Sequence, residues 1–319
     1  MRAIRSAVVT AALAFGLVAV AVAAPAQAAP PAMPDGERLV AASCQYPPYA
    51  DVTLFEVDSA TGASTALASD TVNENFCGYQ GAWDRVTGAF YFTTWDSPES
   101  VLLSWNPVTG VITEIGVVLD EDVALNPYAL VIDLEGNAYF NYSSNLYSLD
   151  LETAEATLLG ELTAVTTSGW GFSVDPVTGE LYLLEQDGDL FLVDIDAVTA
   201  TYVASWPLSD DADFAYGLAI DSAGTAWVVE SPGADDNYSA LWSTPLASFG
   251  DTVERSGNIV DAATGVGFSG WWVSLIPAAV APPAPQLAAT GVDATPAIAA
   301  AAVLGLGGIL LLARRRRSA

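Results

Sequence analysis

Histidine and lysine are absent from this chain of 319 residues, and all nine of its basic residues are arginines. Without an imidazole there is no Ser-His-Asp or Cys-His machinery and no histidine zinc site. Without lysine there is no Schiff-base nucleophile. If the protein is an enzyme at all, its chemistry has to rest on carboxylates.

Positive charge is also scarce in the body of the chain. Between the two termini only Arg38, Arg85 and Arg255 oppose the 37 acidic residues of 29–290, so this segment carries a net charge of −34. Nucleic acid is excluded as a partner because almost nothing neutralises phosphate. An anionic membrane surface is disfavoured for the same reason. Arg85 directly follows Asp84, and we expect it to pair with a neighbouring acid.

The N-terminus has the pattern of a secretory signal peptide. Arg2 and Arg5 precede a run of apolar residues, and small residues stand at Ala26 and Ala28. This pattern predicts export and cleavage after Ala28, so the signal peptide covers residues 1–28. An uncleaved membrane anchor is the alternative.

Cysteine is nearly absent as well, with only Cys44 and Cys77. An even number of cysteines in an exported protein favours a disulfide. A Cys44–Cys77 bridge closes a loop of about thirty residues and contributes roughly 3 kcal/mol.

The C-terminus combines three features. The pentapeptide Leu287-Ala288-Ala289-Thr290-Gly291 precedes an apolar segment, residues 297–313, which is long enough to cross a bilayer. Four arginines follow the segment and are expected to stay on the cytoplasmic side of the membrane. This order resembles the LPxTG-type sorting signal of Gram-positive cell-wall proteins. With alanine in place of proline at position 288, the pentapeptide is similar to the LAxTG substrates of class E sortases of high-GC Gram-positive bacteria.

The resemblance implies that a sortase cleaves between Thr290 and Gly291 and joins the Thr290 carbonyl to a peptidoglycan amine. The membrane is then a partner only before sorting, through the C-terminal segment. A plain type I membrane anchor is the alternative. A GPI-type anchor needs a tail that ends apolar, and this tail ends in arginines.

These signals divide the chain into a signal peptide, an ectodomain (29–276), a proline- and alanine-rich linker (277–286) and the sorting signal (287–319). The linker composition is typical of an extended, semi-rigid spacer.

The ectodomain reads as a repeat of short β-strands. Alternating runs such as "NAYFNY" and "ELYLLE" are bounded by turn residues. Two turn motifs recur in alternation, each every 42 to 49 residues. One is centred on Asp84, Asp133, Asp175 and Asp221, the other on Asp58, Asn106, Asp150 and Asp194. We interpret these residues as turn-forming, since a catalytic group is rarely needed once per repeat.

Two hairpins per repeat predict an all-β fold, a β-propeller with four strands per blade. We expect five blades, with six as the alternative. The first repeat lacks its innermost strand, and the stretch "TGVGFSGWWVSL" supplies one at the other end. The ring is therefore predicted to close by pairing N- and C-terminal strands. The repeats resemble NHL-type and lactonase-like propellers in general pattern only.

An aromatic residue stands five positions before each aspartate of the first motif: Tyr79, Tyr128, Trp170 and Tyr216, with Val266 at the matching place in the last repeat. We expect the aromatics at one mouth of the central channel. There they either bind a ligand or pack, buried, between blades. Trp95, on a loop of the same face, is a further candidate for ligand binding.

Acidic loops are expected on that face too. Asp120 with Asp122 and Asp211 with Asp213 are spaced as oxygen ligands of Ca²⁺ can be, as are Asp187 and Asp189. No cofactor is required by the sequence, and Ca²⁺ is the candidate.

Together these features favour a cell-wall-anchored extracellular protein that presents an acidic propeller to a glycan or protein ligand. An enzyme is not expected. The runner-up is a secreted glycoside hydrolase with a carboxylate pair drawn from Asp122, Asp213 and Glu74. A purely structural wall protein is the third hypothesis.

Overall fold

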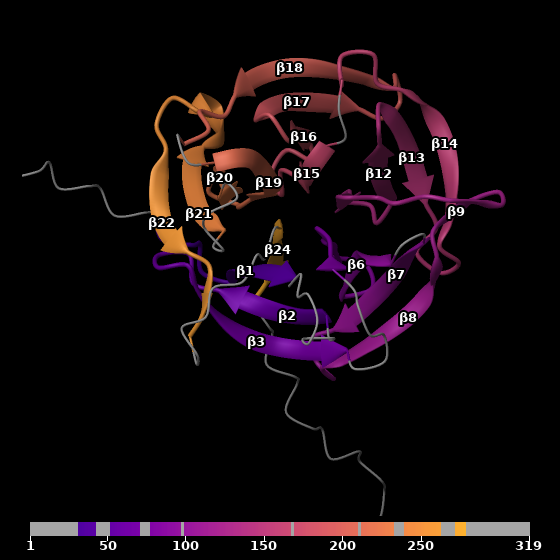
Figure 1. Ribbon diagram of the computed structural model, residues 1–319, viewed down its shortest axis with the longest axis horizontal. Helices are drawn as coiled ribbons and strands as arrows, with labels where there is room; N and C mark the ends of the chain where they lie inside the picture. Colours follow the sequence, from indigo (N-terminus) through magenta and orange to yellow (C-terminus); the bar gives the residue numbers. More distant parts are fainter. Residues whose placement is uncertain are drawn as a thin grey trace, which may run out of the picture.

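The repeats fold as five antiparallel sheets arranged around a central axis (Figure 1). Each sheet is one blade, so the predicted β-propeller and its five-blade count are confirmed. This computed structural model describes residues 31–42, 52–70, 77–96, 99–166, 169–209, 212–232, 239–262 and 272–278.

Four blades follow the chain in order, each with its first strands near the axis and its last strand outermost. Blade 2 consists of β4 (Cys77–Gly78), β5 (Ala82–Asp84), β6 (Ala89–Asp96), β7 (Glu99–Asn106) and β8 (Val111–Val117). Blade 3 contains β11 (Leu130–Ile132), β12 (Ala138–Tyr142), β13 (Asn145–Leu149) and β14 (Glu155–Glu161). Blade 4 contains β15 (Gly169–Val174), β16 (Leu181–Glu185), β17 (Asp189–Asp194) and β18 (Thr199–Ser205). Blade 5 contains β19 (Ala212–Ile220), β20 (Thr225–Pro232), β21 (Ala240–Pro245) and β22 (Glu254–Asn258), with a 3₁₀ turn at Leu246–Ser248 between the last two.

Blade 1 closes the ring with strands from both ends of the chain. Its inner strand β24 (Trp272–Pro277) pairs with β1 (Glu37–Ala42) over six residues, and β2 (Val52–Val57) and β3 (Ala63–Asp70) complete it. The predicted pairing of the termini is therefore confirmed. The alignment of the last repeat is corrected, because Trp272 of the closing strand lies with the aromatics that the sequence aligned with Val266, and Val266 lies outside the described residues. Six ladder pairs with β1 set this register, whereas the sequence comparison rested on the short match "GFS".

Two short strands join neighbouring blades at the outer edge. After blade 2, β9 (Leu119–Asp120) pairs in parallel with β14 and then forms a hairpin with β10 (Val123–Ala124). After blade 5, β23 (Val260–Asp261) pairs in parallel with β3. Both strands therefore fasten the outermost strand of the next blade, far from the axis.

The repeated aspartates form turns, as expected. In the exposed turn between β2 and β3, Asp58 Oδ1 accepts the N–H groups of Ala60 and Thr61 and the hydroxyl of Thr61. In the turn between β19 and β20, Asp221 is fully buried and accepts three hydrogen bonds, from two backbone N–H groups and the Trp227 indole. The glycine that ends each of these turns has a positive φ, +74° at Gly62 and +79° at Gly224.

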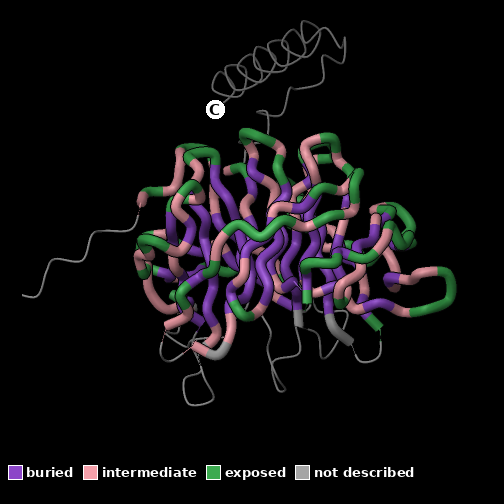
Figure 2. Tube along the Cα trace, turned by 90° about the horizontal axis from the view of Figure 1, so that it is seen from above, coloured by how far each residue is buried: buried purple, intermediate pink, exposed green. Residues whose placement is uncertain are grey.

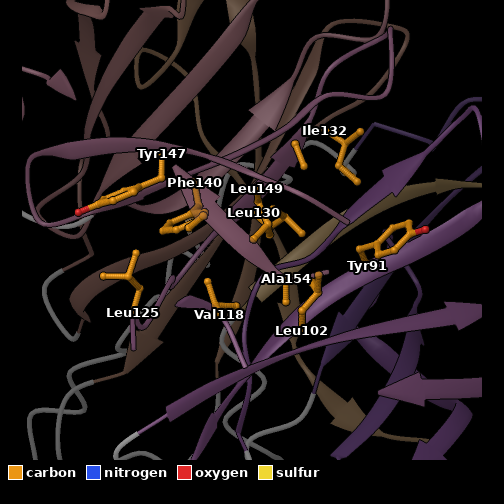
Figure 3. Packing of buried hydrophobic residues seen from close by; sticks show 12 residues of the cluster. Tyr91, Leu102, Val118, Leu125, Leu130, Ile132, Phe140, Tyr147, Leu149 and Ala154 are labelled. Atoms are coloured by element: carbon orange, nitrogen blue, oxygen red, sulfur yellow. The ribbon is translucent and has the colours of Figure 1, made fainter. Parts of the chain in front are cut away.

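The hydrophobic core is divided among the blades. Each pair of neighbouring blades encloses one cluster of buried side chains, and a sixth cluster lies at the axis. In the cluster between blades 2 and 3, Tyr91 and Leu102 of blade 2 face Leu130, Ile132 and other side chains of blade 3 (Figure 3). Seen from the side, buried residues run through the middle of the ring, and exposed ones mark its turns (Figure 2).

No helix in the described part of the chain is long and apolar enough to cross a membrane. The predicted segment 297–313 lies outside the described residues.

Asp221→Ala is expected to lower the free energy of unfolding by about 2–4 kcal/mol, because it leaves buried donors without an acceptor. Asp58→Ala also removes three hydrogen bonds, but in an exposed turn where water replaces them, and it should cost about 1 kcal/mol or less. Urea denaturation of both variants measures the difference. Equal losses would show that burial is not what makes the Asp221 turn important.

Candidate functional site

An aromatic cluster closes one end of the central channel. It consists of Tyr79, Tyr216 and Trp272, which are buried, and of Tyr128, Trp170 and Phe214, which are half-buried. Trp170, Phe214 and Trp272 come from the first residues of their inner strands, Tyr216 lies in the middle of β19, and Tyr79 and Tyr128 precede β5 and β11.

Trp170 is the centre of this cluster. Its ring stacks on Tyr128, with centroids 5.0 Å apart and 11° between the planes, and on Phe214 at 6.4 Å and 21°. On its other sides lie Tyr216 at 4.5 Å and Trp272 at 6.4 Å. Such stacked and edge-on pairs contribute about 0.5–1.5 kcal/mol each beyond the area they bury. The cluster is therefore a rigid unit that holds four blades and the closing strand together.

The structure brings the four predicted aromatics together at one mouth of the channel, as expected. Trp272 occupies the place predicted for Val266, and Phe214 joins the cluster. Trp95 lies in β6, but its side chain is outside the described residues.

Close approach of the inner strands keeps the channel narrow behind the aromatics. A Cβ atom on Gly171 would lie 2.8 Å from the backbone nitrogen of Leu218. At Gly217, which has a φ of +69°, it would lie 2.8 Å from the nitrogen of Val273. Only glycine allows the strands of blades 4, 5 and 1 to converge this tightly.

Gln80 crosses the channel directly beneath the aromatic cluster. Its buried side-chain amide donates to the carbonyls of Phe172 (2.8 Å) and Leu218 (2.7 Å). Its Oε1 accepts the N–H groups of the same two residues at 3.2 and 3.3 Å. Its own backbone carbonyl accepts the N–H of Leu130. One residue of blade 2 thus bonds blades 3, 4 and 5.

Beyond Gln80 the channel widens into a cavity of about 400 Å³. Its wall is formed by the inner strands of all five blades, and it extends to the turns at their far ends, where Asp35, Glu37, Arg85, Pro176 and Pro277 surround the mouth. The two ends of the channel therefore differ, since one is filled by aromatic rings and the other is a pocket.

Arg85 lies exposed at this mouth, and no ion pair is found for it among the described residues. The expected pairing with a neighbouring acid was therefore wrong. Its neighbour Asp84 is instead engaged by the turn, where it accepts the N–H groups of Val86 and Thr87. The other two arginines of the body are engaged, Arg38 with Glu56 at 3.3 Å and Arg255 with Asn258 and the Trp242 ring.

Of the predicted metal ligands Asp120, Asp122, Asp211 and Asp213, the structure describes the side chains of Asp120 and Asp122. Asp120 and Asp122 lie in and beside the β9–β10 hairpin, at the outer edge of blade 3, not on the face that carries the aromatics. This position follows from the parallel pairing of β9 with the outermost strand β14. Asp211 and the side chain of Asp213 lie outside the described residues.

A different group of carboxylates does come together. Oxygen atoms of Glu185, Asp187 and Asp189, around the turn from β16 to β17, lie within 4.8 Å of one another. Glu185 is buried and accepts the Thr166 N–H at 2.7 Å, and Asp189 accepts the Ser205 hydroxyl at 2.5 Å. Three carboxylates in this arrangement could hold a metal ion, and oxygen ligands suit Ca²⁺. The sequence pointed to Asp187 and Asp189, whereas Glu185 was missed because it belongs to the regular pattern of a strand.

No carboxylate pair for glycoside hydrolysis is assembled from the predicted candidates in the described part of the chain. Asp122 is peripheral, and Glu74 and the side chain of Asp213 are not described. The buried Glu230 accepts bonds from the Trp206 indole (2.7 Å) and from the backbone and hydroxyl of Ser209, so its role is to hold that loop.

Cys44, the linker beyond 278 and the sorting residues Leu287, Ala288, Ala289, Thr290 and Gly291 lie outside the described residues, as does the side chain of Cys77. The backbone at Cys77 runs close to β1, because a Cβ on Gly78 would lie 2.6 Å from the Cβ of Ala42. The disulfide stays a prediction, and Cys44 follows Ala42 by two residues.

No family model matches the chain, and no curated protein matches it. Among solved structures, one of a nidogen/laminin complex is similar over 75% of this chain and 98% of the matched chain, with 13% identity and a TM-score of 0.47. TolB from Acinetobacter baumannii is 13% identical over 68% of this chain and 52% of its own, with a TM-score of 0.43. Regucalcin from Agrobacterium tumefaciens, a calcium-binding protein, is 17% identical over 64% of this chain and 68% of its own, with a TM-score of 0.42. Likeness at this level says nothing about a ligand of this chain.

The raised pKa of Tyr128 predicts that the aromatic cluster is sensitive to alkaline pH. Burial raises the pKa of its phenol above the ordinary value of 10.0, Tyr142 adds to the rise, and a hydrogen bond with Asn126 opposes it. The Tyr128 phenol has a higher pKa in the folded protein than in the unfolded chain. The folded protein therefore keeps its full stability below about pH 10 and loses stability as the pH rises through the folded-state pKa of Tyr128.

Tyr128→Phe removes this ionisation and is expected to shift alkaline unfolding to higher pH, as followed by circular dichroism. Tyr202→Phe, which alters an exposed hydroxyl on β18, is the control. Alkaline unfolding of Tyr128→Phe at the wild-type pH would show that this phenol does not limit the stability of the cluster.

Proposed function

We propose that this protein is a cell-wall-anchored surface protein that presents its propeller as a ligand-binding module. The observation that carries the binding role is the aromatic cluster at one end of the channel. The half-buried rings of Tyr128, Trp170 and Phe214 are fixed by stacking on each other and on three buried aromatics. Rigid aromatic surfaces of this kind bind sugar rings and apolar groups at a low entropic cost.

The direction in which the chain leaves the propeller supports anchoring. Pro277 ends β24 at the mouth opposite the aromatic cluster, and the linker continues from there. A tether attached at this end turns the aromatic face away from its attachment point. The sorting signal resembling LAxTG supplies the attachment, through Thr290 to peptidoglycan by means of a sortase.

Ca²⁺ is the candidate cofactor of this module. Glu185 ends the second strand of blade 4, Asp189 begins the third, and Asp187 lies in the turn between them. The net charge of −34 on residues 29–290 also concentrates cations near the surface. The binding experiment is therefore run both with Ca²⁺ and with a chelator.

Anchoring is tested by Thr290→Ala, which removes the residue that the sortase joins to peptidoglycan. The variant is expected to be lost from the wall fraction that survives detergent and heat, and to appear in membranes or medium. Thr290→Ala protein that is still wall-linked after this treatment would contradict sorting.

Binding is tested on an array of glycans and matrix proteins with residues 29–286. Trp170→Leu keeps an apolar side chain but removes the stacking plane, and should weaken a specific interaction by about tenfold. Tyr202→Ala, an exposed aromatic on an outer strand, should not. A uniform blank with and without Ca²⁺ would instead favour a structural wall protein, and release of cleaved sugar would favour the glycosidase.

A further inference from the structure

The pocket on the other side of Gln80 is separate from the aromatic face and has its own chemistry. Its volume of about 400 Å³ lies at the lower end of the range for small-molecule sites. Along β24 it extends from Ser274 to Pro277, three residue steps, or about 10 Å. It is therefore suited to a small molecule and not to a polymer chain.

The polar side chains in the inner part of this pocket are already engaged. The amide of Gln80 uses both its donors and both acceptor positions on Phe172 and Leu218. Ser274 donates to the carbonyl of Gly81 at 2.6 Å, and Ser173 accepts the N–H of Ile220 at 3.2 Å. The remaining wall is made by residues such as Ala82, Val131, Val174, Leu218 and Ile220. A group placed against Gln80 is expected to be nonpolar, since these polar side chains offer it no free hydrogen-bonding partner.

The mouth, in contrast, carries charges of both signs. Arg85 is the one arginine of the described body that has neither an ion pair nor an aromatic ring beside it. Asp35 is exposed on the same rim. Glu37 is half-buried there and accepts the Ser222 N–H at 3.1 Å through Oε2. A ligand head group at this rim therefore meets one cation and two carboxylates.

The field of the whole ectodomain restricts the ligand further. With a net charge of −34 on residues 29–290, a simple anion is repelled at long range although Arg85 would bind it locally. A simple cation would leave Arg85 without a partner and would lie next to the positive charge of that arginine. A zwitterion satisfies both signs at the rim and has no net charge to be repelled.

From these four features we infer that the channel pocket binds a free nonpolar α-amino acid. Its side chain points toward Gln80, its carboxylate pairs with Arg85, and its ammonium group faces Asp35 and Glu37. A free α-amino acid carries both charges on the atom next to its nonpolar group, which an internal peptide residue does not.

The test uses three ligands with the same phenyl group and different charges: L-phenylalanine, 2-phenylethylamine and 3-phenylpropionate. Isothermal titration calorimetry of the purified protein at low ionic strength should give a Kd below about 1 mM for L-phenylalanine. The amine and the carboxylate, which each lack one charge, should bind at least tenfold more weakly. Failure of L-phenylalanine to bind, or equal binding of all three ligands, would overturn the proposal.

Two surface variants assign the contacts without disturbing the core. Arg85→Gln should weaken the binding of L-phenylalanine about tenfold, and this loss of affinity should be confined to ligands that carry a carboxylate. Asp35→Asn should weaken only ligands that carry an ammonium group, and Tyr202→Phe should change nothing. If L-phenylalanine bound to the Arg85→Gln variant as tightly as to the wild type, its carboxylate would not pair with Arg85, and the proposed site would be refuted. Because Gln80 separates this pocket from the aromatic face, a failure here leaves the array experiment unaffected, and the reverse also holds.

Discussion

The side-chain amide of Gln80 is the interaction on which the centre of this molecule depends. It forms hydrogen bonds to backbone groups of blades 4 and 5, and its backbone carbonyl bonds blade 3. A buried amide with all its donors and acceptors satisfied is strong and directional, because any displacement leaves several groups unpaired in a nonpolar setting. The same bonds separate the aromatic cluster from the pocket on the other side of Gln80.

Closure of the ring is the second constraint. The clusters between blades bury side chains only if every blade has two neighbours, and β24 supplies the inner strand that blade 1 would otherwise lack. The same strand provides Trp272 to the aromatic cluster and Ser274 to the pocket wall. Residues near the C-terminal end of the propeller thus take part in closing the ring and in building both ends of the channel.

The repeat made much of this predictable from the sequence. Asp-x-x-Thr-Gly turns occur in several repeats, so their alignment gave the blade count, and the unequal ends of the repeat predicted the closure. Features that occur in only one of the repeats were not predictable in this way. Gln80 has no counterpart in the other repeats, where Ala129, Gly171, Gly217 and Val273 stand at the corresponding positions. The outer position of Asp120 depends on a parallel pairing of two residues, which leaves no pattern in the sequence. The sequence did not show that Arg85 lacks an ion pair among the described residues. The acid beside it, Asp84, is already hydrogen-bonded within its own turn.

The most direct test of the divided channel is a crystal structure of the protein under xenon pressure. Xenon occupies nonpolar cavities that have no free hydrogen-bonding groups. A channel divided at Gln80 should hold a xenon atom between Gln80 and the mouth, against Val131 and Ile220, with Gln80 bonded to Phe172 and Leu218. A file of ordered waters that runs past Gln80 toward Trp170 would contradict it, because the channel would then be one polar passage and not two separate sites.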